Sequence, residues 1–207
     1  MPLKYQVPDD KKVRVIVDSD AACEADDPFA IAHALLCDKF IVKAIFAEHF
    51  NCEGSMKQSF EEIQRVVKAM KKEVPVLMGE IGKLSEKGTG EISEASSFLI
   101  REALREDDKP LYVLCIGAIT NIASAIQACP DIVPRMTVVW IGGQSHEHST
   151  GEVREFNAGN DIEAANLVLG SGVRFWQIPN DVYGSMRISL AEIQMRVAPC
   201  GEIGKHL

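Results

Sequence analysis

Short apolar runs, rich in β-branched residues, alternate with segments of helical periodicity along most of the chain. The apolar runs predict strands at residues 13–17, 40–47, 74–78, 111–116, 136–141 and 173–178. The periodic segments predict a helix that opens at Asp27 and further helices at residues 55–72, 93–107, 120–129, 161–169 and 189–197. Strands that alternate with helices favour a mainly parallel sheet with helices on both faces. We therefore expect one α/β domain over residues 1–207.

Polar clusters follow the carboxyl ends of several predicted strands. They lie at residues 18–27, 48–51, 117–121 and 142–157. In open parallel sheets, ligands bind outside the carboxyl ends of the strands, where such clusters meet. The sequence therefore predicts one ligand site assembled from loops that are far apart along the chain.

The first of these clusters is the most acidic. Five carboxylates fall within ten residues, with no Lys or Arg among them: Asp18, Asp20, Glu24, Asp26 and Asp27. Clustered carboxylates repel one another and resist loss of water, so a fold that gathers them usually holds a divalent cation or uses one as a base or nucleophile. Oxygen ligands suit Ca²⁺ or Mg²⁺ rather than zinc. The alternative interpretation is a solvated acidic loop.

Composition narrows the possible partners. The formal net charge is -8 and the pI is about 5.2, with no visible basic patch, which disfavours nucleic acid and anionic membrane as partners. The six cysteines form no Cys-x-x-Cys pair, so a zinc site is not expected. Residues 1–12 are polar and do not read as a signal peptide, and no apolar run reaches membrane-spanning length. The cytoplasm is the expected location.

Four segments, in order along the chain, carry a family resemblance. They are VDSD with DDPFAIA (17–20 and 26–32), IGAITNIA (116–123), WIGG (140–143), and EFN with DIEAA (155–157 and 161–165). The set resembles the inosine–uridine-preferring nucleoside hydrolases, with Ala118 where the family has Pro. The resemblance implies a Rossmann-like, nucleoside hydrolase-like fold. It also implies calcium-dependent hydrolysis of an N-ribosidic bond, a small-molecule nucleoside or ribose as partner, and a homo-oligomer (dimer or tetramer).

The same resemblance implies a role for individual residues. Asp20 would ligate Ca²⁺ and act as the base that activates water, Asp27 would ligate the ion through both oxygens, and Thr120 would ligate it through its backbone carbonyl. Asp18 would be a supporting acid. The remaining matches would bind the ribose hydroxyls: Asp26, Asn51, Glu155 and Asn157.

Some features depart from the family pattern. The loop from Asp20 to Asp26 is longer than usual, and residues 149–154 replace a Gly-Asn-x-Thr-Pro segment. No segment matches the family's C-terminal His–Asp pair, so we expect the family's usual C-terminal part to be missing. His49, His146 and His148 are candidates to contact the leaving base. The alternative for His146 and His148 is a pair of exposed loop histidines.

Two other functions fit part of this pattern. Asp18-x-Asp20 after an apolar strand also resembles the start of a haloacid-dehalogenase-type phosphatase, with Asp18 as nucleophile and Asp20 as acid/base. A catalytically degenerate relative that binds ribose or nucleoside without turnover is the second alternative.

Overall fold

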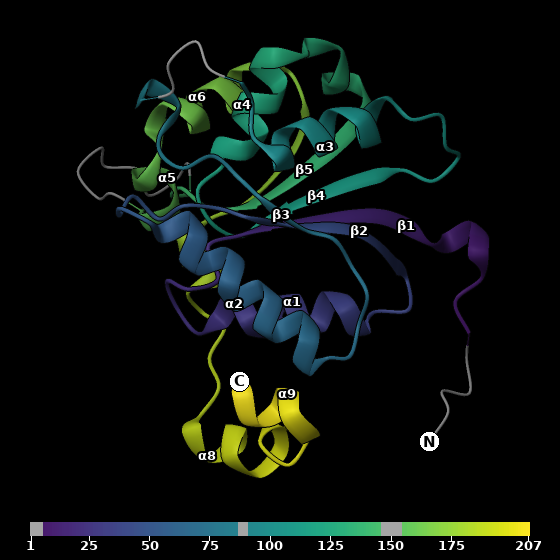
Figure 1. Ribbon diagram of the computed structural model, residues 1–207, viewed down its shortest axis with the longest axis vertical. Coiled ribbons are helices and arrows are strands. Elements are labelled where there is room, and N and C mark those ends of the chain that lie inside the picture. The colour runs from purple at the N-terminus through teal and green to yellow at the C-terminus, as the bar shows by residue number, and fades with distance from the viewer. Residues whose placement is uncertain (1–5, 87–90, 146–154) are drawn as a thin grey trace.

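A fully parallel six-stranded sheet forms the centre of the molecule (Figure 1). The computed structural model describes residues 6–86, 91–145 and 155–207. The sheet has the order β3-β2-β1-β4-β5-β6. Its strands are β1 (Val13–Ser19), β2 (Phe40–Ala47), β3 (Val76–Met78), β4 (Leu111–Cys115), β5 (Met136–Ile141) and β6 (Arg174–Ile178).

The strand order reverses between β1 and β4. From β1 the chain moves outward through β2 to β3, then returns to the other side of β1 and moves outward through β4, β5 and β6. The register pairs Asp18, near the end of β1, with Cys115, the last residue of β4. Crevices at such reversal points are where open α/β sheets bind ligands, so the acidic loop after β1 stands at the expected place.

Helices cover both faces of the sheet. Figure 1 shows α1 (Asp26–Leu36) and α2 (Ser55–Ala69) on one face, and α3 (Glu94–Leu104), α4 (Thr120–Ala128) and α6 (Ile162–Gly170) on the other. Successive side chains of a strand point to opposite faces, so Val15 and Val17 pack toward α1 and α2 while Ile16 packs in the opposite core. The same alternation continues into the acidic segment and sorts its side chains between the two faces.

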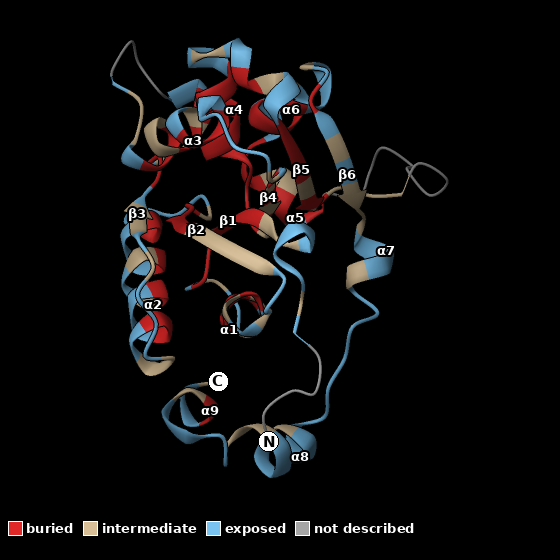
Figure 2. Ribbon diagram, turned by 90° about the vertical axis from the view of Figure 1, so that its right-hand side faces the viewer, coloured by how far each residue is buried: buried red, intermediate tan, exposed pale blue. Residues whose placement is uncertain are grey.

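Short elements complete the chain. These are η1 (Asp9–Lys11), η2 (Leu84–Glu86), η3 (Pro130–Arg135), α5 (Phe156–Asn160), α7 (Asn180–Tyr183), α8 (Leu190–Glu192), η4 (Ile193–Val197) and α9 (Gly201–His206). The last helix, α9, packs against α2. Gly204 permits a close turn there, because a Cβ at this position would lie 1.9 Å from the Val197 carbonyl oxygen. Figure 2 shows that α7 and α8 are largely exposed. No helix among the described residues is long and apolar enough to cross a membrane.

The α/β fold with a mainly parallel sheet is confirmed, and the predicted strands all occur. The bounds of β2 and β5 agree with the predicted 40–47 and 136–141, and most other elements differ by one to three residues at an end. One extension matters for the site. Strand β1 continues to Ser19 instead of ending at residue 17, so Asp18 and Ser19 hold fixed strand positions with opposite orientations.

Candidate active site

The acidic cluster divides into a buried and an exposed part. Asp18, Asp20 and Asp27 are buried, with 0 %, 2 % and 5 % of their surface exposed. Glu24 and Asp26 are exposed. The alternative of a wholly solvated acidic loop is therefore wrong, because its inner acids are enclosed at the point where the strand order reverses.

The buried acids lack the partners that buried charges normally need. One oxygen of Asp18 and one of Asp20, the Oδ2 atom in each case, is buried with no hydrogen-bond partner. Among the described residues, no Lys or Arg forms an ion pair with Asp18, Asp20 or Asp27. Natural proteins rarely tolerate such groups without a functional reason. Asp18 lies within hydrogen-bond reach of the Glu48 carboxyl, so the oxygen of Asp20, which also lines a cavity, is the better candidate for a cation ligand.

Burial shifts the pKa values of these acids upward. Burial raises the pKa of Asp18 to about 7, although a hydrogen bond from Asn121 lowers it. Burial also raises the pKa of Asp20 to about 7, and the negative charges of Asp26 and Glu24 raise it further. Burial and then the charge of Asp20 raise the pKa of Asp27 well above its usual range, although the Ser19 hydroxyl donates to Asp27 Oδ1 at 2.6 Å. A nearby cation would favour the ionised forms.

Gly117, two residues after the end of β4, makes room for Asp20. A Cβ at Gly117 would lie 2.6 Å from Asp20 Oδ1 and 2.8 Å from its Cγ, closer than real Cβ contacts come. The Trp140 indole N–H donates to the Gly117 carbonyl oxygen at 3.0 Å and fixes this turn. The sequence contains the signal, because a glycine follows a strand in the reversal crevice, but only the structure connects it to Asp20.

A buried polar network supports the acids from beneath. The Asn121 side-chain amide donates to Asp18 Oδ1 at 2.8 Å and to the Ala47 carbonyl at 3.2 Å. Glu48 accepts the backbone N–H groups of Asn121 and His49, each at 3.1 Å. Burial, followed by the charge of Asp18, raises the pKa of Glu48 well above its usual range. Glu48 Oε1 also lies 3.6 Å from His49 Nε2.

His49 connects two of the predicted ligand residues. The Thr120 hydroxyl donates to Asp161 Oδ2 at 2.8 Å, so His49 Nε2 must carry the proton that it shares with Thr120 Oγ1 at 2.9 Å. The other ring nitrogen, Nδ1, accepts the Asn51 N–H at 3.2 Å. Burial lowers the pKa of His49, against the charge of Asp161. The ring is 0 % exposed, so it offers no surface to a leaving base and instead positions Asn51 and Thr120.

Glu155 holds the opposite wall of the site. Its Oε2 atom accepts the N–H groups of Gly143 at 2.6 Å and Ala158 at 2.8 Å. Its Oε1 atom accepts the Asn157 N–H at 2.9 Å and the Tyr183 hydroxyl at 2.6 Å. This carboxylate therefore caps the short helix α5 and fastens it to the end of β5.

A small cavity of about 50 Å³ lies between the two walls. It brings together Asp20, Asp26, Asp27 and Asn157 of the predicted site, and its lining also includes Cys23, Glu24, Ile116, Ile141, Phe156 and Tyr183. Five predicted residues that the structure describes do not line it: Asp18, His49, Asn51, Thr120 and Glu155. Tyr183 had no motif to mark it, although it follows the carboxyl end of β6. The predicted His146 and His148 lie outside the described residues.

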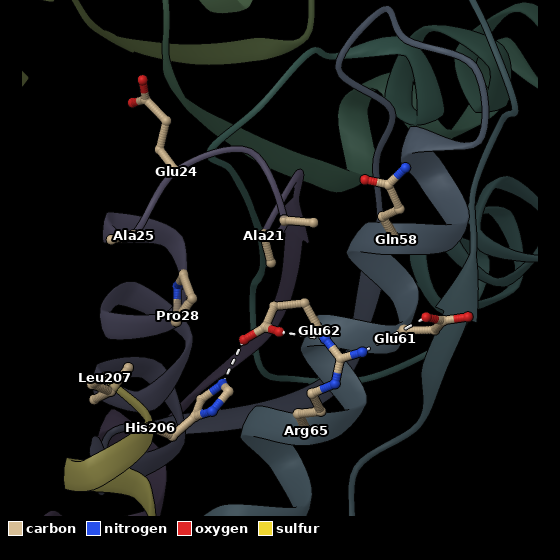
Figure 3. A pocket seen from close by; sticks show the side chains of 11 residues that line it. Ala21, Glu24, Ala25, Pro28, Gln58, Glu61, Glu62, Arg65, His206 and Leu207 are labelled. Carbon is tan, nitrogen blue, oxygen red and sulfur yellow. Dashed lines mark hydrogen bonds and ion pairs between the residues drawn. The ribbon is translucent and has the colours of Figure 1, made fainter.

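A larger hollow of about 420 Å³ lies on the other side of the β1–α1 loop. Figure 3 shows it between that loop, α2 and the chain end, with His206 turned toward Glu62 and Arg65 paired with Glu61 and Glu62. Glu24 lines both hollows. The basic groups here are already engaged by carboxylates, so the acids of the small cavity are the chemically distinctive feature.

The small cavity offers part of the oxygen ligand set that calcium needs. Asp20 and Asp27 supply hard oxygen atoms, and the buried, unpartnered Asp20 Oδ2 is the atom best suited to a cation. Among residues 6–86, 91–145 and 155–207, no three His, Cys, Asp or Glu side chains gather as metal ligands. Ca²⁺ takes about six to eight oxygens, so water and ligand hydroxyls would have to complete the shell.

Comparison with known proteins identifies the family of this chain. The model of the inosine-uridine preferring nucleoside hydrolases matches residues 15–204. The chain belongs to this family. The phosphatase alternative is therefore set aside, and the fold and recognition expected from the four motifs are confirmed.

Curated nucleoside hydrolases match part of the chain. The non-specific ribonucleoside hydrolase RihC of Escherichia fergusonii is 35 % identical over 91 residues, which cover 43 % of this chain and 30 % of that protein. RihC of Shigella sonnei is 36 % identical over 84 residues, covering 40 % and 28 %. The matched region thus spans less than a third of the length of these nucleoside hydrolases.

Solved structures share the fold over almost the whole chain. An inosine-guanosine nucleoside hydrolase superposes with a TM-score of 0.74 at 21 % identity, covering 93 % of this chain and 69 % of that one. The type III effector XopQ, complexed with adenosine diphosphate ribose, gives 0.77 at 13 % identity, covering 97 % and 65 %. At these identities the likeness establishes the fold.

Proposed function

We propose that this chain hydrolyses the N-glycosidic bond of a ribonucleoside, or a related N-riboside, to ribose and free base with the help of Ca²⁺. The observation that carries the proposal is the enclosed Asp20 carboxylate with its unpartnered oxygen. It shares one cavity with Asp26, Asp27 and Asn157, at the reversal point of a nucleoside hydrolase fold.

The chemistry suits these side chains. Breaking an N-ribosidic bond builds positive charge on the sugar, as in other glycoside hydrolysis. Carboxylates held in an enclosed site stabilise that charge. We assign Asp20 as the base that takes the proton from the attacking water. Bound calcium would supply positive charge that orders the sugar diol and makes the water easier to deprotonate.

Asp27 and Asp20 are the proposed side-chain ligands of the ion, and the Thr120 carbonyl is the proposed third ligand. Asp26 and Asn157 would bind ribose hydroxyls, because both line the cavity. Asn51 and Glu155 are sugar contacts by resemblance alone, and the four acceptor sites of Glu155 are already filled by protein donors. Asp18 would support the site through Asn121.

The partner, the oligomeric state and the location of the protein are also proposals. A small nucleoside or ribose is the proposed partner, and the net charge of -8 argues against nucleic acid. A homo-oligomer, dimer or tetramer, is proposed on the family resemblance. A cytoplasmic location is proposed because the six free cysteines suit a reducing compartment.

A ribose-binding relative without turnover is the second candidate. Glu155 already has four donors from the protein, and the cavity is only about 50 Å³. Either feature would limit a productive complex with a whole nucleoside.

The test is release of ribose from a panel of ribonucleosides, with calcium and with a chelator, for the wild type and Asp20→Ala. We expect calcium-dependent turnover that the substitution abolishes. Ribose binding without hydrolysis would favour the second candidate. Full activity of Asp20→Ala would remove Asp20 from the role of base.

A further inference from the structure

The hydrogen bonds around Glu155 leave it no free acceptor. A carboxylate has about four lone-pair sites. Three of them take backbone N–H groups, from Gly143, Asn157 and Ala158, and the fourth takes the Tyr183 hydroxyl at 2.6 Å. A sugar hydroxyl can reach Glu155 only by displacing one of these donors.

Tyr183 is the one donor of the four that comes from a side chain. It belongs to α7, after the carboxyl end of β6, whereas the other three belong to the loop after β5 and to α5. Its hydroxyl also accepts the Asn180 side-chain amide at 3.0 Å. Glu155 and Asn180 thus hold the phenol from two sides, and the phenol lines the same cavity as Asp20, Asp26 and Asp27.

A phenol oxygen fixed in this way keeps some capacity to accept a further hydrogen bond from a ligand. Its ring also presents an apolar body beside a polar tip, which suits the mixed surface of a sugar. On the basis of the proposed function, we propose that Tyr183 contacts a ribose hydroxyl in the cavity, and that Glu155 serves as the positioning residue that anchors it.

A competing explanation predicts the opposite result. If Tyr183 only blocks Glu155, removal of its hydroxyl frees a carboxylate oxygen, and sugar binding becomes tighter. If Tyr183 makes the contact, removal of its hydroxyl weakens binding by the value of one hydrogen bond, which is about three- to tenfold in affinity.

Tyr183→Phe is the test, with Tyr112→Phe as the matched control. Tyr112 lies on β4 with its ring against Trp176, outside the cavity lining. Ribose affinity is measured by calorimetry in calcium, and KM and kcat are measured with a ribonucleoside. Thermal unfolding shows that both variants fold.

We expect Tyr183→Phe to weaken ribose binding and raise KM by about three- to tenfold with little change in kcat, and Tyr112→Phe to match the wild type. Wild-type or tighter binding by Tyr183→Phe, beside an active wild type, overturns the inference alone. A wild type that neither binds ribose nor cleaves any nucleoside overturns the proposed function and this inference together.

Discussion

Buried ionisable side chains lie at both ends of strand β1, and the two ends differ in whether these side chains have partners. At its start, Arg14 donates to Glu102 Oε1 at 3.0 Å and to the Lys109 carbonyl at 2.8 Å, in an enclosed ion pair. At its end, Asp18 and Asp20 each keep an oxygen with no partner. Paired charge at one end serves the fold, and unpaired charge at the other is kept at a cost that points to a ligand.

The pKa shifts follow the same division. At the amino end, the Lys109 backbone N–H, with the nearby Arg14 and Arg105, holds the pKa of Asp107 below its usual value. At the carboxyl end, burial raises the pKa of Asp20 to about 7. Disruption of the buried Arg14–Glu102 pair should therefore harm the fold at the amino end, and removal of an acid should harm the activity at the carboxyl end.

Asp20→Asn should give the largest effect on activity. Loss of a positioned base typically costs about 10²- to 10⁴-fold in rate. Without calcium, the variant should unfold at a temperature equal to or above that of the wild type, because a buried unpaired carboxylate has gone. Ribose release and calorimetric unfolding check both parts, and wild-type turnover would contradict the assignment.

Arg14→Met should give the largest effect on stability. It removes the only cation that hydrogen-bonds to Glu102 among the described residues, at 3.0 Å, and leaves Arg105 at 3.8 Å and Lys43 at 4.0 Å. Breaking a buried pair typically costs about 3–5 kcal/mol, and these two remaining cations should keep the loss at the lower end of that range. Urea unfolding measures the loss, and kcat per folded molecule should stay unchanged. The double variant with Glu102→Leu serves as control and should recover most of the loss. If Arg14→Met were as stable as the wild type, the ion pair at the amino end of β1 would not stabilise the fold, and the contrast between the two ends would be wrong.

Asp27→Asn should weaken calcium binding. A ligand at about one hundred times its Kd stabilises a protein by about 2.7 kcal/mol, so calcium should raise the unfolding temperature of the wild type and have less effect on this variant. Asp108→Asn, which changes an acid at the amino end with an 88 % exposed side chain, should respond to calcium like the wild type. Equal responses from all three proteins would show that the ion binds elsewhere.

Gly117→Ala should disturb Asp20 without removing it. The added methyl group would lie 2.6 Å from Asp20 Oδ1, so the carboxylate must move. A displacement of about 1 Å can cost as much as about 10²-fold in rate, and the overpacking should cost about 1–3 kcal/mol. Gly170→Ala, where an added Cβ meets nothing within 4 Å, is the control. Unchanged kcat in Gly117→Ala would mean that Asp20 tolerates other positions.

The alkylation rate of the Cys23 thiol should depend on the negative charges of the acidic loop. Burial and the charges of Asp20, Glu24 and Asp27 raise the pKa of its thiol to about 11. Because the thiolate is the reactive form, alkylation at pH 8 should be slower at Cys23 than at the exposed Cys200, and should accelerate as the pH approaches 11. Calcium should also accelerate it. Mass spectrometry of the alkylated peptides gives both rates, and equal rates at pH 8 would contradict the prediction.

Strand alternation and the position of the acids could be predicted from the sequence. The runs at residues 40–47 and 136–141 match β2 and β5 at both ends because each is a mostly apolar run rich in β-branched and aromatic residues. The division of the acids into buried and exposed sets could not be predicted, because it depends on neighbours far along the chain, such as Gly117 beside Asp20 and Asn121 beside Asp18. The roles of His49 and Tyr183 depend on partners far along the chain, Thr120 and Glu155, which no local pattern indicates.

The most direct test of the account is a crystal structure of the protein with calcium and ribose. The account predicts one cation in the cavity after β1, bound by Asp20 and Asp27, with two sugar hydroxyls completing its shell. A structure in which calcium is absent from this cavity, while ribose binds elsewhere or not at all, would contradict it.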